Sequence, residues 1–376
     1  MRFLPIAGLV FIAALSNAGV LKVTSGYLSI NGQKVFLSGP NIAWQSYGYD
    51  FGNGMYDVNG GALESQLRSI SANGGNAVRI WIHVEGDNTP QWDSNGYVTG
   101  LDNTGTMIND LRRFFDAAQA QNIVVIPVLW NAALMRNQNV LNLHWDDAKL
   151  QSYIDNALIP MVSALAGHPA IGAWEIMNEP EGSVLPGSHP DPCADTSALS
   201  GQGPGWSGAN IPMERMLRFL NWQLAAIRNT DPNVLRAVGT WSEQSASDSL
   251  GKKNYYTDEC LERIGGKPGG TVDFYQIHTY SYNGAFSSTS PFKHTASEFT
   301  LDKPVLIGEF SASCGENLGL PTMFDHLYFN GYSGGLTWMY SGASDCGDSQ
   351  QVQNDGYQHI RNYNDPNNGG LVEFVF

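Results

Sequence analysis

Two glutamates end apolar segments of this chain, and together they suggest paired acid and base chemistry. Glu179 follows the run WEIMN at residues 174–178, and Glu309 closes the run VLIGE at residues 305–309. Burying a carboxylate in apolar surroundings costs free energy unless the group is paired. Two carboxyl groups that face each other can cleave a glycosidic bond, because one protonates the leaving oxygen while the other attacks the anomeric carbon.

Five further polar or aromatic side chains stand near the ends of other apolar runs. They are Arg79 in VRIWIH, Asn178 directly before Glu179, His278 and Tyr280 in QIHTY, and Trp338 in LTWMY. If these runs are parallel strands of one barrel, their carboxyl ends meet on one rim, where barrel enzymes hold their active sites. Each residue alone has an ordinary explanation as an ion-pair partner or a core side chain, but their convergence favours a site.

The stretch WEIMNEPEG at residues 174–182 holds three glutamates, which we interpret differently. Glu175 lies four residues before Glu179 and, with the strand period of two, points to the same side at greater depth. We therefore expect Glu175 to be a paired group without a catalytic role. Glu181 follows in a loop, where we expect solvent or a substrate to satisfy it.

Eight short apolar or aromatic runs are candidates for the strands that position these residues. They are Val35 to Leu37, Ala77 to Ile82, Ile123 to Leu129, Ile171 to Met177, Leu235 to Gly239, Phe274 to His278, Val305 to Glu309 and Gly335 to Met339. The runs are continuous rather than alternating, which is typical of parallel strands that are buried on both faces.

Amphipathic stretches separate these runs and predict helices. Apolar residues recur at helical spacing in residues 62–73, 107–121, 146–167 and 212–229, followed by a shorter stretch at 321–331 and a last one at 348–364. Eight strands that alternate with helices predict an α/β fold, a single (β/α)8 TIM barrel. We assign residues 1–18 to a signal peptide and residues 19–376 to one catalytic barrel domain.

Two irregular segments should frame the barrel. Residues 21–37 carry Asn31-Gly32 between two alternating runs, which predicts a β-hairpin with a type I′ turn at the bottom of the barrel. The stretch from Gly182 to Pro212 is rich in Gly, Pro and Ser and lacks periodicity. It follows the fourth strand, so we expect a long loop on the catalytic face.

The charge and aromatic content restrict the partners of this chain. It has 20 basic and 35 acidic residues, which give a formal net charge of −15. Repulsion disfavours binding to nucleic acid or to an anionic membrane. The 10 Trp, 16 Tyr and 16 Phe residues mostly serve the core, but such richness also suits sugar binding. We expect the partner to be a neutral β-linked polysaccharide.

The N-terminus has the features of a secretory signal. Arg2 provides a positive charge, Phe3 to Leu15 form an apolar run, and Ser16-Asn17-Ala18 resembles a cleavage site. The apolar run is too short to span a bilayer comfortably. We expect cleavage after Ala18 and a secreted, extracellular protein.

The cysteines suggest disulfides rather than a metal site. Four are present, none in a C-x-x-C pair and none at zinc-ligand spacing from a histidine. An even number in a secreted protein favours two disulfides, for which three pairings exist. We favour Cys193–Cys260 and Cys314–Cys346, because each pair would tie loops on the same side of the barrel.

The motif WEIMNEP, followed 130 residues later by VLIGEF, resembles glycoside hydrolase family 5, a family of (β/α)8 retaining glycosidases. The resemblance covers essentially the whole mature chain. It implies that Glu179 is the general acid/base and Glu309 the nucleophile. It also implies that substrate is contacted by Arg79, Asn178, His278, Tyr280 and Trp338.

Electrostatics suggests how these roles are divided. Arg79 should hold Glu309 ionised and lower its pKa, and Tyr280 can donate a hydrogen bond to the same carboxylate. Glu179 must begin protonated, and both burial and the negative field of Glu309 should raise its pKa. When Glu309 becomes an ester, Glu179 can ionise and act as the base toward water.

The remaining contacts concern the sugar. Asn178 is placed to bond the 2-hydroxyl, Trp338 to form a platform under the −1 sugar, and His278 to orient Glu179 or a sugar hydroxyl. Many members of the family carry a histidine near the end of the third strand. This sequence instead reads PVLWNAA, and we include Trp130 among the substrate contacts.

The stretches WEIMNEPEG, GPNIAWQSYGYDFG and RIWIHVEGDNTP resemble the secreted mannanases of molluscs and other invertebrates more than the cellulase branch. This resemblance implies endo-hydrolysis of β-1,4-mannosidic linkages in mannan, glucomannan or galactomannan. Mannose and glucose differ only in the orientation of the 2-hydroxyl. The spacing of residues in the sequence does not indicate which orientation the site binds. An endo-β-1,4-glucanase and a non-catalytic polysaccharide-binding barrel therefore stay open.

We expect the reaction to need no cofactor and no metal ion, since two carboxyl groups suffice, and we expect a monomer. A long cleft for a polymer would be lined by some of the aromatic residues near the rim, which are Trp44, Tyr47, Trp81, Trp130, Trp206, Trp241 and Tyr282.

Overall fold

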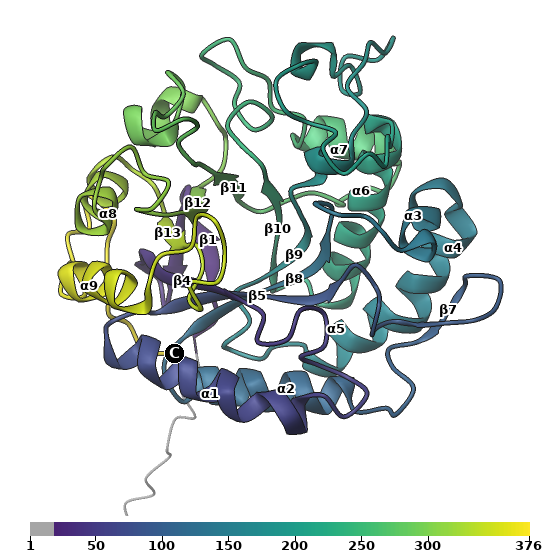
Figure 1. Cartoon of the computed structure of the whole chain (residues 1–376), viewed down its shortest axis with the longest axis horizontal. Coiled ribbons are helices and arrows are strands. Elements are labelled where there is room, and N and C mark those ends of the chain that lie inside the picture. Colours follow the sequence, from purple (N-terminus) through teal and green to yellow (C-terminus); the bar gives the residue numbers. More distant parts are fainter. Residues whose placement is uncertain (1–18) are drawn as a thin grey trace, which may run out of the picture.

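Eight parallel strands close into a barrel in the computed structural model, which describes residues 19–376 (Figure 1). The signal peptide expected at residues 1–18 lies outside the described residues. The barrel strands are β4 (Leu37–Ala43), β5 (Ala77–Val84), β8 (Val124–Asn131), β9 (Ala173–Asn178), β10 (Leu235–Thr240), β11 (Tyr275–His278), β12 (Val305–Phe310) and β13 (Gly334–Thr337). The predicted (β/α)8 barrel is confirmed.

Helices surround the strands in Figure 1. They are α1 (Tyr56–Ala72), α2 (Met107–Gln119), α3 (Gln138–Trp145), α4 (Asp147–Tyr153), α5 (Ile159–Leu165), α6 (Met213–Thr230), α7 (Asp258–Gly265), α8 (Leu320–Phe329) and α9 (Gln350–Ile360). The stretch 146–167 is divided by a π-helical turn at Ile154–Leu158, and α3 and α7 were not predicted. Between β11 and β12 the chain forms only short 3₁₀ turns, at Pro291–Lys293 and Ala296–Phe299, in place of a longer helix.

The first barrel strand corrects the expectation from sequence. The predicted run ended at Leu37, whereas β4 begins there and continues through Gly39, Pro40 and Asn41 to Ala43. These residues read as strand breakers, but Pro40 still pairs in parallel with Thr337 of β13. The amide of Asn41 forms hydrogen bonds in the interior of the barrel, as described below.

A small antiparallel sheet closes the N-terminal end of the barrel. The expected hairpin is present and has a third strand, so that the sheet is formed by β1 (Lys22–Thr24), β2 (Tyr27–Ile30) and β3 (Gln33–Lys34). Asn31 and Gly32 have φ values of 52° and 77°, as a type I′ turn requires. Leu28 and Ile30 pack against the first interior residues of the barrel strands, which include Ala77, Val124, Ala173, Leu235 and Leu306.

Both disulfides have the favoured pairing, Cys193–Cys260 and Cys314–Cys346. The first joins the long loop between β9 and α6 to α7, and the second joins the loops that follow β12 and β13. A short hairpin of β6 (Gln91–Trp92) and β7 (Val98–Gly100) follows β5. Among the described residues, no helix combines the length and the apolar character needed to cross a membrane.

Candidate active site

Glu179 and Glu309 come together at the C-terminal mouth of the barrel. Glu309 lies in β12, and Glu179 directly follows β9. One oxygen of each carboxyl group and a ring nitrogen of His278 all lie within 4.8 Å of one another. Both side chains are largely buried, with exposures of 15% for Glu179 and 6% for Glu309. The structure thus brings the two predicted carboxyl groups within reach of one small reacting centre.

Glu179 has an unusual backbone conformation, with φ 45° and ψ 62°. This left-handed region costs a non-glycine residue roughly 1–2 kcal/mol. The conformation is held by two backbone hydrogen bonds, from Glu179 N–H to the carbonyl of Gly239 at 2.7 Å and from Gly182 N–H to the carbonyl of Glu179 at 2.9 Å. The strain thus lies at the residue expected to transfer the proton.

Arg79 organises the floor of the site. Its Nη1 donates to Glu309 Oε1 at 2.7 Å, while Nε and Nη2 donate to the two oxygens of Glu175 at 2.7 and 2.5 Å. The other two N–H groups donate to Asn41 and Asn178 at 2.8 and 2.7 Å. All five donors of the guanidinium are therefore used. Burial lowers the pKa of Arg79, but Glu175 and Glu309 more than offset this, so Arg79 stays charged.

Neighbouring residues support this ion-pair cluster. Glu175 is fully buried, as its predicted pairing requires, and it also accepts a hydrogen bond from Gln276 at 2.6 Å. A Cβ at Gly239 would lie 2.2 Å from Glu175, so only glycine fits beside the ion pair. Asn41 donates to the carbonyl of Gly308 at 2.8 Å and thereby fixes the strand that carries Glu309. Asn41 and Gln276 were missed from sequence, because nothing near either residue marks a partner.

The protonation states of the two catalytic candidates follow from their surroundings. Burial raises the pKa of Glu179 to about 7, against the opposing effect of Arg79. Burial also raises the pKa of Glu309, although His278 and Arg79 oppose it. The expectation that Arg79 would leave the pKa of Glu309 lowered is thus wrong in its net direction, because desolvation outweighs the guanidinium.

The contacts nevertheless indicate that Glu179, and not Glu309, carries the proton before the reaction begins. Arg79 lies between Glu175 and Glu309, so one cation already faces two carboxylates. Ionising Glu179 as well would place a further uncompensated charge in the buried cluster. Glu309 accepts from Arg79 and, at 2.9 Å, from the hydroxyl of Tyr280, and it is therefore the better stabilised anion.

His278 and Tyr280 lie where the sequence placed them, at the end of β11 and just beyond it. His278 Nδ1 lies 2.8 Å from Glu179 Oε1 and 3.6 Å from Glu309 Oε2. Burial lowers the pKa of His278, which favours the neutral ring. This contact supports the expectation that His278 orients Glu179.

Near the ends of β8 and β9, successive side chains do not alternate strictly between the barrel interior and the surrounding helices. The expectation that Trp130 contacts substrate is wrong for this reason. Trp130 pairs with Met177, and both pack in the core between the barrel and the helices. Trp130 is fully buried and donates to Gln223 of α6 at 2.9 Å, so it does not face the site and is not a substrate contact in this structure. Instead Asn131 turns inward and accepts a hydrogen bond from Asn178 at 3.1 Å.

Aromatic side chains line the side of the mouth formed by β4, β5 and β13. Trp338 follows β13, with Trp44 and Trp81 at ring-centroid distances of 6.0 and 5.9 Å. Nearby, the Tyr47 hydroxyl donates to the buried Glu85 at 2.8 Å, and Glu85 also accepts from Asn131 at 3.1 Å. Glu85 was not singled out from sequence, since a lone carboxylate in a loop has no distinguishing signal.

A cavity of about 610 Å³ opens on the other side of the mouth. It lies among the loops that follow β9, β10 and β11, and it is lined by Trp206, Trp241, Glu243, His278, Tyr280 and Tyr282 among others. Trp206 and Trp241 lie with their ring centroids 5.9 Å apart. The carboxyl pair therefore has aromatic surfaces on both sides.

Glu181 differs from its expected state. It is 1% exposed and accepts hydrogen bonds from Ser245, Tyr256 and the backbone amide of Trp241, so protein groups rather than solvent satisfy it. The loop signal at Pro180 was correct, but the loop folds back over this residue.

Within residues 19–376, the ligand types that a metal ion needs cluster at Glu179, His278 and Glu309. These are the groups that the acid and base chemistry uses, and Arg79 already supplies a positive charge to Glu309. The expectation that no metal ion or cofactor is needed remains a prediction, which activity after exhaustive chelation would test.

A buried carboxylate held by arginine and tyrosine, a second carboxyl group that retains its proton, and aromatic walls at the mouth of a (β/α)8 barrel define the site class of glycosidases. Residues 31–333 match the model of the family described as cellulase (glycosyl hydrolase family 5). This chain therefore belongs to glycosyl hydrolase family 5.

Individual relatives are similar over nearly their full lengths. The chain is 47% identical to a mannan endo-1,4-beta-mannosidase of Cryptopygus antarcticus over 94% of this chain and 93% of the relative. It is 45% identical to a mannan endo-1,4-beta-mannosidase of Mytilus edulis, with coverages of 94% and 95%. The crystal structure of an endo-1,4-beta-mannanase from Eisenia fetida superimposes with a TM-score of 0.94 at 49% identity, over 95% of this chain and 99% of the other.

Proposed function

We propose that this protein is a secreted endo-β-1,4-mannanase that hydrolyses mannan, glucomannan or galactomannan with retention of anomeric configuration. One observation carries the choice of substrate: relatives 47% and 45% identical over 94% of the chain bear the name mannan endo-1,4-beta-mannosidase. The reaction chemistry is supported by the arrangement of Glu179, Glu309 and Arg79.

In the first step, a carboxylate oxygen of Glu309 attacks the anomeric carbon of the −1 mannosyl unit. The bond to the leaving oxygen breaks as Glu179 gives that oxygen its proton. Glu309 then forms a neutral ester and Glu179 a carboxylate. Arg79 and Tyr280, which hold Glu309 before the attack, fix its orientation toward the substrate.

In the second step, Glu179 removes a proton from water while the oxygen of that water attacks the anomeric carbon. The ester bond breaks, and Glu309 returns to the carboxylate form that Arg79 stabilises. The loss of negative charge at Glu309 during the intermediate lowers the pKa of Glu179 and so makes it a base at the moment when one is needed.

Retention is supported by the closeness of the two carboxyl groups. Their nearest oxygens lie within 4.8 Å of each other. Retaining glycosidases separate the two groups by about 5–5.5 Å, whereas inverting enzymes need about 6.5–9.5 Å to admit water between them. Attack in the interior of a polymer is supported by the aromatic surfaces on both sides of the pair, at Trp338 and at Trp241.

The substrate assignment is tested by incubating the purified protein with mannohexaose and cellohexaose in parallel. We expect mannohexaose to yield mannobiose and mannotriose, with little cleavage of cellohexaose. Cleavage confined to cellohexaose would favour the glucanase alternative instead. Binding without cleavage of either would favour the non-catalytic barrel.

Secretion is supported by the two disulfides, which persist in oxidising compartments. N-terminal sequencing of the protein recovered from culture medium should begin at Gly19. The monomer stays a prediction, which sedimentation of the mature protein should check against the mass expected for one chain.

A further inference from the structure

Glu181 is a buried carboxylate that the reaction described above does not use. It lies two residues after the proton donor, in the 3₁₀ turn Pro180–Ser183. The hydroxyl of Tyr256 donates to it at 2.6 Å and that of Ser245 at 2.5 Å. The backbone N–H of Trp241 donates to its other oxygen at 3.1 Å. Burying this carboxylate away from solvent costs free energy, which its three hydrogen-bond donors offset.

The backbone beside Glu181 holds a second tryptophan. The carbonyl of Glu181 accepts from the N–H of Gly205 at 2.9 Å, and that of Gly182 accepts from the N–H of Ser207 at 2.8 Å. These two bonds flank Trp206 on both sides. A Cβ at Gly182 would lie 2.6 Å from the indole of Trp206, so the ring rests directly on this glycine.

The single turn Pro180–Ser183 therefore holds both tryptophans of the cavity. Trp241 is fixed through its amide and Trp206 through its flanking backbone and its ring face. The cavity that they line also reaches His278, whose ring contacts the proton donor. Because the donor protonates the leaving oxygen, the leaving part of the substrate occupies this side, opposite Trp338.

We propose that Glu181 is a positioning residue that shapes the leaving-group side of the cleft by holding Trp241 and Trp206 in place. The inference rests on the proposed function, since it assigns the two tryptophans to the part of a mannan chain beyond the cleavage point. Glu181 does not touch the reacting atoms and acts only through the loops.

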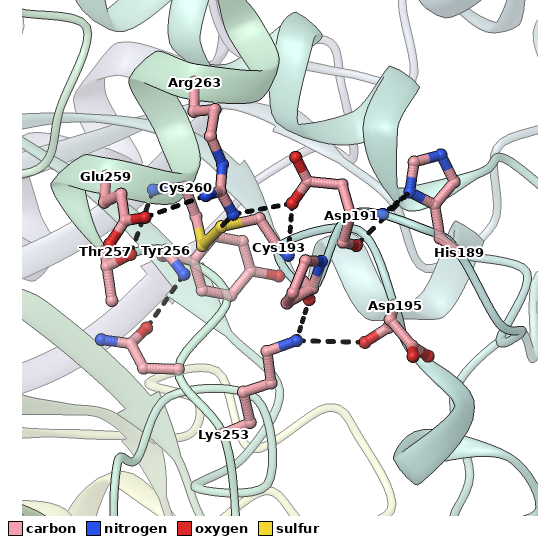
Figure 2. The surroundings of a disulfide bond; sticks show 12 residues. His189, Asp191, Cys193, Asp195, Lys253, Tyr256, Thr257, Glu259, Cys260 and Arg263 are labelled. Atoms are coloured by element: carbon pink, nitrogen blue, oxygen red, sulfur yellow. Dashed lines mark hydrogen bonds and ion pairs between the residues drawn. A yellow bond between two sulfur atoms is a disulfide. The ribbon is translucent and has the colours of Figure 1, made fainter.

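The loops around the cavity are also joined to each other on the side away from the cavity. Glu181 joins them on the side that faces it. Figure 2 shows the Cys193–Cys260 disulfide beside Tyr256, with Arg263 of α7 donating to Asp191 at 2.7 Å. Lys253 donates to the carbonyl of Asp195 at 3.2 Å. These contacts hold residues 191–195 to the segment 253–263, and Glu181 joins the same two loops at the wall of the cavity.

The test compares Glu181→Leu with Glu181→Gln on two substrates. Mannohexaose spans both sides of the cleft, whereas 2,4-dinitrophenyl β-mannobioside extends only a small, good leaving group beyond the cleavage point. Leucine leaves the Trp241 amide and two hydroxyls without an acceptor. Glutamine keeps an acceptor, and the hydroxyls can reverse to receive its N–H groups.

We expect Glu181→Leu to lower kcat/KM for mannohexaose by about tenfold or more, mainly through KM, and to change it for the dinitrophenyl glycoside by less than about threefold. Glu181→Gln should recover most of the loss. Asp273→Asn is the matched control. Like Glu181, Asp273 accepts a hydrogen bond from a backbone N–H, that of Arg236 at 2.8 Å. Asp273 lies just before β11, at the opposite end of the barrel from the cavity. It should leave both values of kcat/KM unchanged.

Equal losses on both substrates, or unchanged kinetics in Glu181→Leu, would overturn the proposal. If this variant fails to fold, Ser245→Ala combined with Tyr256→Phe removes two of the three donors and is expected to give the same selective loss. Failure of the proposed function is distinguishable, because the unaltered protein would then not cleave mannohexaose.

Discussion

The two ends of the barrel interior are formed by the same strands, but one end is lined by apolar side chains and the other by charged ones. At the N-terminal end, Ala77 of β5 and Ala173 of β9 face an apolar layer that Leu28 and Ile30 cover. Two residues further along the same strands, Arg79 and Glu175 form a fully buried ion pair. The change from an apolar layer to a charged one therefore takes place within about 7 Å of strand, given the rise per residue.

Stability and reactivity are therefore supplied by different layers along the barrel axis. The apolar layer gains free energy from burial and needs only matching shapes. The charged layer costs desolvation, which five hydrogen bonds from Arg79 and the shared carboxylates offset. Substitutions in the apolar layer should alter the free energy of unfolding. Substitutions in the charged layer should alter the rate of glycoside hydrolysis.

The largest effect should come from Glu309. Glu309→Gln removes the nucleophile while retaining nearly the same shape, and we expect kcat on mannohexaose to fall by about 10⁴-fold or more. Mannotriose should still bind, as calorimetry can measure. Turnover within tenfold of the unaltered protein would remove Glu309 from the nucleophile role.

A change at the N-terminal end should act on stability alone. Leu28 is fully buried beneath the barrel, and Leu28→Ala should lower the free energy of unfolding by about 2–5 kcal/mol. The measurement is urea denaturation of both proteins, with kcat/KM below the transition as the control. A drop in kcat/KM of more than about threefold at a temperature where the variant is folded would contradict the separation.

The pH dependence should report the proton on Glu179. Burial raises the pKa of this carboxyl to about 7, and the reaction needs the protonated form. We therefore expect kcat/KM for mannohexaose to fall about tenfold per pH unit above pH 7. Glu179→Ala should lose this alkaline limb when assayed on the dinitrophenyl glycoside, whose leaving group needs no acid. An unchanged limb in that variant would assign it to another group.

A smaller effect is expected from Tyr280, whose hydrogen bond lowers the pKa of Glu309. In Tyr280→Phe the pKa of Glu309 should rise, so the acid limb of the pH profile should move to higher pH, and kcat should fall by about tenfold. A downward shift of the acid limb would mean that Tyr280 does not act on Glu309.

Much of this architecture could be predicted from the sequence, because buried parallel strands leave continuous apolar runs. The carboxyl pair could be predicted for the same reason, since Glu179 and Glu309 interrupt such runs at their ends. The strand β4 could not be placed, because Gly39, Pro40 and Asn41 resemble a loop when their partners are unknown.

The error at Trp130 arose in the pairing of β8 with β9, whereas the error at Glu181 arose in the loop that folds back over this residue. Strict alternation would turn Trp130 inward, but the paired irregularity with Met177 turns both outward and brings Asn131 and Asn178 into the site. The same irregularity breaks the period of two from which we interpreted Glu175. The expectation that Glu175 is buried and paired was nevertheless correct. Such shifts depend on the neighbouring strand and leave no local trace.

In the proposed mechanism Glu309 forms a covalent bond to the sugar and Glu179 does not. The most direct measurement is to incubate the protein with 2-deoxy-2-fluoro-β-mannosyl fluoride, digest it with pepsin and locate the added mass by tandem mass spectrometry. We expect one added fluoromannosyl group, on the peptide that contains Glu309. A label on Glu179, or inactivation without a label at Glu309, would contradict this mechanism.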